Sequence, residues 1–191
     1  MPRDRLRNFA ALEYGDPRGI LVKLRELEPK IASSDLDIKV RTLRTNQLKP
    51  LRELREGALF AYFMSERIGA HVRIAHGESQ DYDFVATWES GGFRRYAPVQ
   101  IKEVVPPFLN PNAQLSAVIE SLKKYTDSAD LTVAIHLNTN TQFDPHDLDI
   151  PKLSIAALWV FGAIAPRAAR WGLWGDLLGA RMGTEHDYPV D

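Results

Sequence analysis

The feature that most constrains the fold is a pair of glycines between two strand-like segments. Residues 84–88 and 96–105 are rich in β-branched, aromatic and other apolar side chains, and Gly91 and Gly92 lie between them. Adjacent glycines adopt the positive φ angles of a tight turn without steric cost, which is typical of a β-hairpin. The sequence therefore predicts a hairpin that brings Asp83, at the start of one strand, close to the middle of the other.

Hydrophobic periodicity predicts the elements around this hairpin. Apolar residues recur at helical spacing in three segments, residues 18–31, 51–68 and 112–125. Strand-like patterns occupy three others, residues 71–76, 131–137 and 153–165. We also expect a short strand at 38–43, a helix at 171–181 and a polar tail at 183–191. This mixture predicts an α/β fold.

Composition limits the kind of protein this is. A chain of 191 residues with 45% hydrophobic and 26% charged residues can bury one sizeable core. It contains no cysteine, so only oxygen and imidazole remain as strong metal ligands. The first residues lack the apolar segment of a secretory signal, which predicts a cytoplasmic protein. The longest apolar run, residues 153–165, is too short to cross a bilayer, so we expect no membrane association.

Charge leaves the kind of partner open. The net charge is −1, which argues against a purely electrostatic nucleic-acid binder. The stretch 39–55 is nevertheless basic, with Lys39, Arg41, Arg44, Lys49, Arg52 and Arg55 against one acid, Glu53. The candidate phosphate contacts are Lys49, Arg52, Arg94, Arg95 and Lys123. Each of them is equally well interpreted as part of a solvated helix or hairpin surface.

The hairpin presents a group of residues suited to metal chemistry. Alternation places Gln100 and Lys102 on one face of their strand, and the turn brings Asp83 beside them. A carboxylate oxygen, an amide oxygen and the backbone carbonyl of Ile101 are hard ligands that suit Mg²⁺ or Mn²⁺. Lys102 is placed to orient or deprotonate a metal-bound water and to neutralise charge on a phosphate.

These residues resemble the PD-(D/E)XK nuclease superfamily, in the variant with Gln in place of the third-strand acid that is similar to Mrr-type restriction endonucleases. The resemblance covers residues 51–138 and implies a restriction-endonuclease-like core, in the order αβββαβ, with a mixed sheet flanked by helices. Residues 1–50 and 139–191 are then N- and C-terminal extensions. The family also has a helical Glu, which corresponds to Glu56, with Glu66 as a rival.

The resemblance implies an endonuclease that uses Mg²⁺ or Mn²⁺ to hydrolyse phosphodiester bonds of DNA. Its metal ligands are expected to be Asp83, Gln100, Ile101 and Glu56, with Lys102 as the remaining catalytic residue. A homodimer is compatible with this activity. The alternative is a catalytically inactive nuclease-fold module that acts in nucleic-acid or protein binding and assembly. The histidines lack the compact spacing of zinc ligands and are interpreted as surface or core residues, although His76 ends the strand expected beside Asp83.

Overall fold

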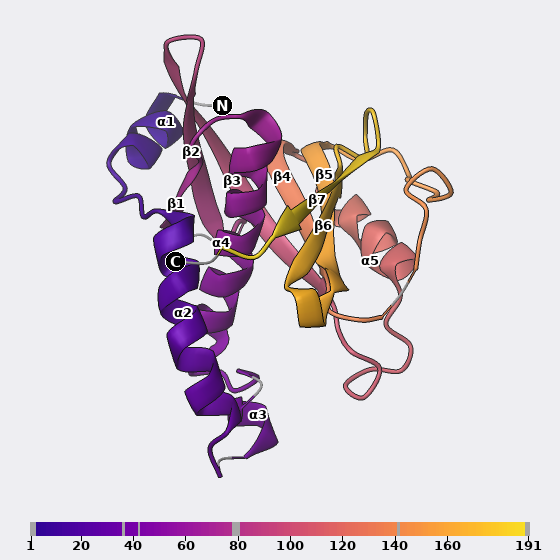
Figure 1. The fold of residues 1–191 in the computed structure, drawn as a ribbon. Coiled ribbons are helices and arrows are strands. Elements are labelled where there is room, and N and C mark those ends of the chain that lie inside the picture. The colour runs from indigo at the N-terminus through magenta and orange to yellow at the C-terminus, as the bar shows by residue number, and fades with distance from the viewer. Residues whose placement is uncertain (1–2, 36, 42, 78–80, 141, 190–191) are drawn as a thin grey trace. The chain divides into compact units, whose positions relative to one another are not determined.

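A computed structural model describes residues 3–35, 37–41, 43–77, 81–140 and 142–189 (Figure 1). The strands pair in chain order, from β1 to β7, in a mixed sheet, and helices complete the fold. The predicted α/β class is confirmed. The chain divides into two compact units, residues 3–96 and residues 97–188, and strand β3 passes from the first into the second. Each unit is described by itself below.

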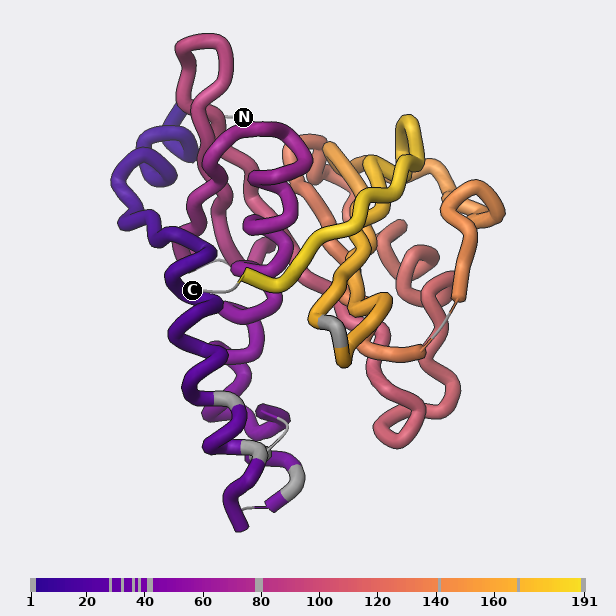
Figure 2. Tube along the Cα trace, viewed as in Figure 1, coloured from indigo at the N-terminus to yellow at the C-terminus, as the bar shows by residue number. Residues whose placement is uncertain are grey.

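The first unit contains most of the helices. Its elements are α1 (Arg3–Ala10), α2 (Pro17–Ala32), α3 (Ile38–Arg41), α4 (Lys49–Ile68), β1 (Arg73–His76), β2 (Phe84–Ser90) and the start of β3 (Phe93–Val104). The helices predicted at 18–31 and 51–68 are confirmed as α2 and α4, which lie side by side (Figure 2). Gly69 ends α4 in the left-handed conformation expected of a helix stop. No helix within the described ranges is long and apolar enough to cross a membrane.

The predicted strand at 38–43 is wrong, because residues 38–41 form the helical turn α3; residue 42 lies outside the described residues. The Asp37 carboxylate accepts a hydrogen bond from the backbone amide of Lys39 at 2.8 Å, and the Asp37 carbonyl accepts one from the amide of Val40 at 2.9 Å. A carboxylate in this position accepts hydrogen bonds from backbone amides at the start of a helix. In a strand, the same amides would need a neighbouring strand as their partner. Local capping therefore outweighs the β-branched character of the segment.

The hairpin forms where the glycines predict it. Gly91 and Gly92 have φ angles of 61° and 75°, so both adopt the left-handed conformation of a two-residue turn. The strands run closer to the turn than expected, since β2 ends at Ser90 and β3 begins at Phe93. Strand β1 pairs antiparallel with β2, on the side that the hairpin leaves available.

The second unit contains the rest of β3 and a sheet of mixed direction. Its other elements are α5 (Leu115–Ser121), the 3₁₀ turn η1 (Leu122–Lys124), β4 (Ser128–Leu137), β5 (Ile155–Ala165), the 3₁₀ turn η2 (Pro166–Ala168), β6 (Arg170–Gly175) and β7 (Met182–Asp187). Strands β3, β4 and β5 are parallel, and β6 and β7 continue the sheet antiparallel. Side chains with no solvent exposure form the centre of its core, namely Val133, Ile135, Leu158, Val160, Phe161 and Leu173.

Two predictions for the C-terminal segment are wrong. The helix expected at 171–181 is instead strand β6, and the tail expected at 183–191 contains strand β7. Trp171 and Leu173 are buried two residues apart, opposite Ala163 and Phe161 of β5. Gly172 and Gly175 would destabilise a helix in this segment. The apolar side chains instead alternate between the two faces of the sheet, with the two-residue period of a strand.

Residues 138–140 and 142–154 belong to the long connection between β4 and β5 (Figure 2). Arg181 holds part of this connection to the second unit. The Arg181 Nη1 donates to the backbone carbonyls of Leu148 at 3.1 Å, His146 at 3.3 Å and Pro145 at 3.4 Å. Its Nε donates to the Leu177 carbonyl at 3.2 Å. One guanidinium thus fixes the connection to the turn that precedes β7.

Asp16 caps α2 and is predicted to make a pH-dependent contribution to stability. Partial burial alone would raise the pKa of Asp16, but hydrogen bonds from His71 and from the Gly19 amide outweigh it and lower the pKa. Because a lowered pKa favours the folded protein only while the carboxylate is charged, this contribution is present at neutral pH and is lost as the pH falls through that pKa. Asp16→Ala should cost about 1 kcal/mol at neutral pH, and less in acid.

Urea unfolding of Asp16→Ala at several pH values checks this, with the exposed Glu26→Ala on the same helix as the control. A destabilisation that stays constant down to acidic pH would contradict the capping role.

Arg181→Ala is predicted to loosen residues 144–148, because it removes the donor that holds their carbonyls. Backbone amides of that segment should exchange hydrogen several-fold faster, and the free energy of unfolding should fall by about 1–3 kcal/mol. Hydrogen exchange followed by mass spectrometry measures the first effect. The exposed Arg167→Ala is the matched control, and equal exchange in both variants would show that Arg181 does not anchor the connection.

Candidate functional site

Strand β3 positions the predicted amide and ammonium within the second unit. Gln100 is 8% exposed and pairs with Val133 of β4, while Lys102 is half-buried and pairs with Ile135. Residues two apart in a strand project to the same face, so both side chains leave β3 on one side. The Gln-x-Lys sequence therefore presents its two polar groups together, from a strand with a neighbour on each side.

The Gln100 side chain is oriented by its own strand. Its Nε2 donates to the backbone carbonyl of Ile101 at 3.3 Å, in a buried environment. The carboxamide therefore presents its NH₂ group, and not its oxygen, toward that carbonyl. Coordination by both oxygens would thus require the carboxamide to rotate, so that its oxygen takes the place of its nitrogen.

The Lys102 ammonium lies over an aromatic ring. Its Nζ is 5.9 Å from the centre of the Tyr125 ring, and the Nζ of Lys124 is 5.3 Å from the same centre. Ring faces attract cations by their quadrupole, an interaction that limits where a flexible lysine rests. Tyr125 therefore helps to hold Lys102 on the face that Gln100 shares.

Asp83 lies in the first unit, directly before β2, and lines a pocket of about 330 Å³. Glu13, Glu53 and His76 also line it, among mostly apolar neighbours. The His76 Nδ1 is 3.2 Å from the backbone oxygen of Asp83, so the histidine at the end of β1 does approach the predicted ligand. The arrangement puts carboxylates and an imidazole around one concave surface.

The two glutamates considered for the helical acid differ in burial. Glu56 is 4% exposed within α4, whereas Glu66 is exposed. Burial of a carboxylate is costly without a partner, which makes Glu56 the more constrained of the two. Glu56 does not line the Asp83 pocket. The residues of α4 that line it include Glu53 and Gly57, on another side of that helix.

Three of the five predicted phosphate contacts form ion pairs within the chain. Lys49 pairs with Glu53 at 3.1 Å, Arg94 pairs with Glu89 at 3.5 Å, and Lys123 pairs with Glu120. The guanidinium of Arg95 lies 5.6 Å from the centre of the Phe93 ring, and Arg52 is half-buried in α4. Exposed ion pairs contribute little to stability, so these cations can exchange their acids for phosphate at small cost.

The opposite face of β3 carries a polar pair that the sequence analysis missed. Glu103 pairs with His136 of β4, and a carboxylate oxygen and an imidazole nitrogen of the two lie within 4.8 Å. The Asn138 amide donates to the Glu103 carboxylate at 2.8 Å. His136 is 3% exposed and stacks on Phe161 and Trp171, at 5.0 and 5.9 Å between ring centres.

This pair offers a nitrogen and an oxygen donor in fixed orientations, a combination that suits a transition metal ion better than Mg²⁺. Burial of His136 agrees with its interpretation as a core histidine. The missed residue is Glu103, which directly follows Lys102 and projects to the other face. Only the parallel register of β3 and β4 places it opposite His136.

The chain thus presents an amide and an ammonium on one face of β3, a Glu–His pair on the other face, and a carboxylate-lined pocket before β2. No protein-family model, curated protein or solved structure matches it.

Proposed function

We propose that the protein is a metal-dependent nuclease that hydrolyses phosphodiester bonds of DNA. The observation that carries the proposal is the order and direction of elements around the Gln-x-Lys strand. Helix α4, three strands, helix α5 and β4 follow one another, with β1 antiparallel to β2 and β3 parallel to β4. This is the order expected of the PD-(D/E)XK core, and Asp83 and Lys102 are the residues that the resemblance assigns to its catalytic positions.

The proposal requires a shared site for Asp83 and Gln100, as the resemblance implies. In a two-residue turn through Gly91 and Gly92, Ser90 stands opposite Phe93. If the same pairing runs without a bulge to the start of β2, Asp83 falls opposite Gln100. The proposal requires this extension, and with it a carboxylate and an amide on neighbouring strands.

The ligands proposed for Mg²⁺ or Mn²⁺ are the oxygens of Asp83, Gln100 and Ile101, with Glu56 as a further acid. When bound, the ion polarises a phosphate oxygen and makes a coordinated water a better nucleophile. Lys102 then orients that water and neutralises charge on the phosphate through its ammonium. Tyr125 limits the positions of the ammonium, which keeps it near the Gln100 face.

The alternative is a nuclease-fold module without cleavage activity, acting in binding or assembly. Two features favour it. Gln100 replaces a carboxylate with a neutral amide, and that amide donates to the Ile101 carbonyl instead of offering its oxygen beside it. Retention of DNA binding without hydrolysis would identify this second function.

Cleavage of plasmid and single-stranded DNA with Mg²⁺ or Mn²⁺ tests the proposal. Lys102→Met should lower the rate at least about a hundredfold, the scale expected for an electrostatic or proton-transfer role. Lys124→Met is the matched control, because Lys124 contacts the same Tyr125 ring and lies outside the Gln-x-Lys sequence. It should cleave like the unmodified protein.

Asp83→Asn should reduce both cleavage and Mn²⁺ affinity, since it removes the charge proposed to hold the ion. Absence of cleavage with either ion, or equal rates in the two lysine variants, would contradict the enzymatic proposal.

A further inference from the structure

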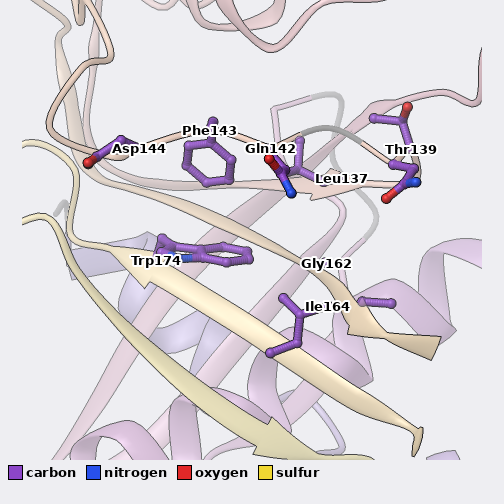
Figure 3. Close-up of a pocket in the computed structure, with 10 residues that line it drawn as sticks. Leu137, Thr139, Gln142, Phe143, Asp144, Gly162, Ile164 and Trp174 are labelled. Atoms are coloured by element: carbon purple, nitrogen blue, oxygen red, sulfur yellow. The ribbon is translucent and has the colours of Figure 1, made fainter. Parts of the chain in front are cut away.

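The second unit contains a pocket that the proposed hydrolysis does not use. Its volume is about 650 Å³, which lies in the range of small-molecule sites. Part of the β4–β5 connection, with Gln142, Phe143 and Asp144, runs over one side, while Gly162, Ile164 and Trp174 of β5 and β6 form the other (Figure 3). The connection is the one that Arg181 anchors.

The position of the pocket is typical of a ligand site. Leu137, which lines it, is the last residue of β4, and the lining residues Thr139 and Asn140 follow directly. In open α/β sheets, ligands bind outside the carboxyl ends of the strands. Strands β4 and β5 are parallel, and the pocket lies at the carboxyl end of both.

The Trp174 indole is seated on glycine backbone. A Cβ at Gly172 would lie 2.3 Å from an atom of the indole, and one at Gly183 would lie 2.8 Å from it. Glycine weakens a strand and is expected where another group must approach closely. Phe143 meets the indole edge to face, with ring centres 5.0 Å apart (Figure 3). The two rings, one from each side of the pocket, thus meet and form an aromatic wall.

The polar lining selects against anions. Among the described lining residues none is basic, and Asp144 adds a carboxylate whose Oδ1 accepts from the His146 amide. Asn140 and Gln142 are exposed amides that offer both donors and acceptors. A flat ligand without negative charge and with donors and acceptors along its edge fits these groups, and a nucleobase has this chemistry.

The pocket shares a sheet face with Lys102. Lys102, Ile135, Val160 and Trp174 are successive partners across β3, β4, β5 and β6. Cross-strand partners project to the same face, so Trp174 lies on the Lys102 side. At about 4.8 Å per strand the two Cα positions are roughly 14 Å apart. Ile135 and Val160, which lie between them, are fully buried, so this distance crosses packed core and is not an open groove.

We propose that this pocket binds one unstacked nucleobase of the substrate strand. The base lies beside the contacting Trp174 and Phe143 rings, with the amides of Asn140 and Gln142 along its edge. That the base belongs to a nucleic acid rests on the proposed function. The phosphates of that nucleic acid remain outside the pocket. Binding of a base in this pocket would make single-stranded or locally opened DNA the preferred substrate, because a base that is paired and stacked in a duplex cannot enter the pocket.

Tryptophan fluorescence and calorimetry with uncharged nucleosides test the pocket on the intact chain. We expect adenosine or thymidine to bind and to change the emission. Trp174→Leu should weaken binding about tenfold, because it removes the larger of the two rings that form the aromatic wall. Gln142→Ala, at an exposed position, should weaken it several-fold without affecting folding. Trp88→Leu, in β2 of the first unit, is the matched control and should bind normally.

The inference is overturned if no nucleoside binds, if both tryptophan variants bind equally, or if glucose or inorganic phosphate binds in their place. Its failure is distinguishable from failure of the proposed function, because nucleoside binding needs neither metal nor cleavage. Nucleoside binding without DNA cleavage would retain the pocket and reject the nuclease. DNA cleavage that is unchanged in Trp174→Leu, with no nucleoside binding, would reject only the pocket.

Discussion

The parallel pairing of β3 with β4 and of β4 with β5 is the constraint on which the second unit depends. It aligns residues in rows across the sheet, and each row belongs to one face. The row through Lys102 ends at Trp174, while the next row joins Glu103, His136 and Phe161. A shift of one residue between β3 and β4 would exchange the faces and separate both groups.

The two faces of β3 therefore present different chemistry. Gln100 and Lys102 offer an amide and an ammonium, which suit a hard cation and a phosphate. Glu103 and His136 offer a carboxylate and an imidazole held in place by Asn138 and by stacking, which suit a softer ion or a proton transfer. A metal-binding measurement on this protein has to separate the two faces, because Mn²⁺ accepts either donor set.

Much of the fold could be predicted because its signals are local. The glycine pair gives the hairpin, and helical spacing gives α2 and α4. The wrong predictions concern segments whose structure depends on a contact with another strand or with a capping side chain. Trp171 and Trp174 fit a helix by spacing, yet pairing with β5 makes that segment a strand. At 38–43 a capping carboxylate, Asp37, turned a strand-like run into a helical turn.

For the candidate site, the sequence could supply a proposal only for residues near the hairpin. Asp83, Gln100 and Lys102 could be proposed, since a tight turn fixes which residues of two adjacent segments approach each other. Glu103 could not, because its partner His136 is 33 positions away and is set by strand register. The pocket also could not be predicted from the sequence, because Leu137, Phe143 and Trp174, which line it, come from three separate segments of the chain.

We propose that Asp83 and the Gln100–Ile101 segment bind one cation, and diffraction from crystals soaked in Mn²⁺ is the direct test. We expect an anomalous peak within coordination distance of the Asp83 carboxylate and of the Gln100 or Ile101 oxygen. A peak at Glu103 and His136 alone, or no peak at either position, would contradict it.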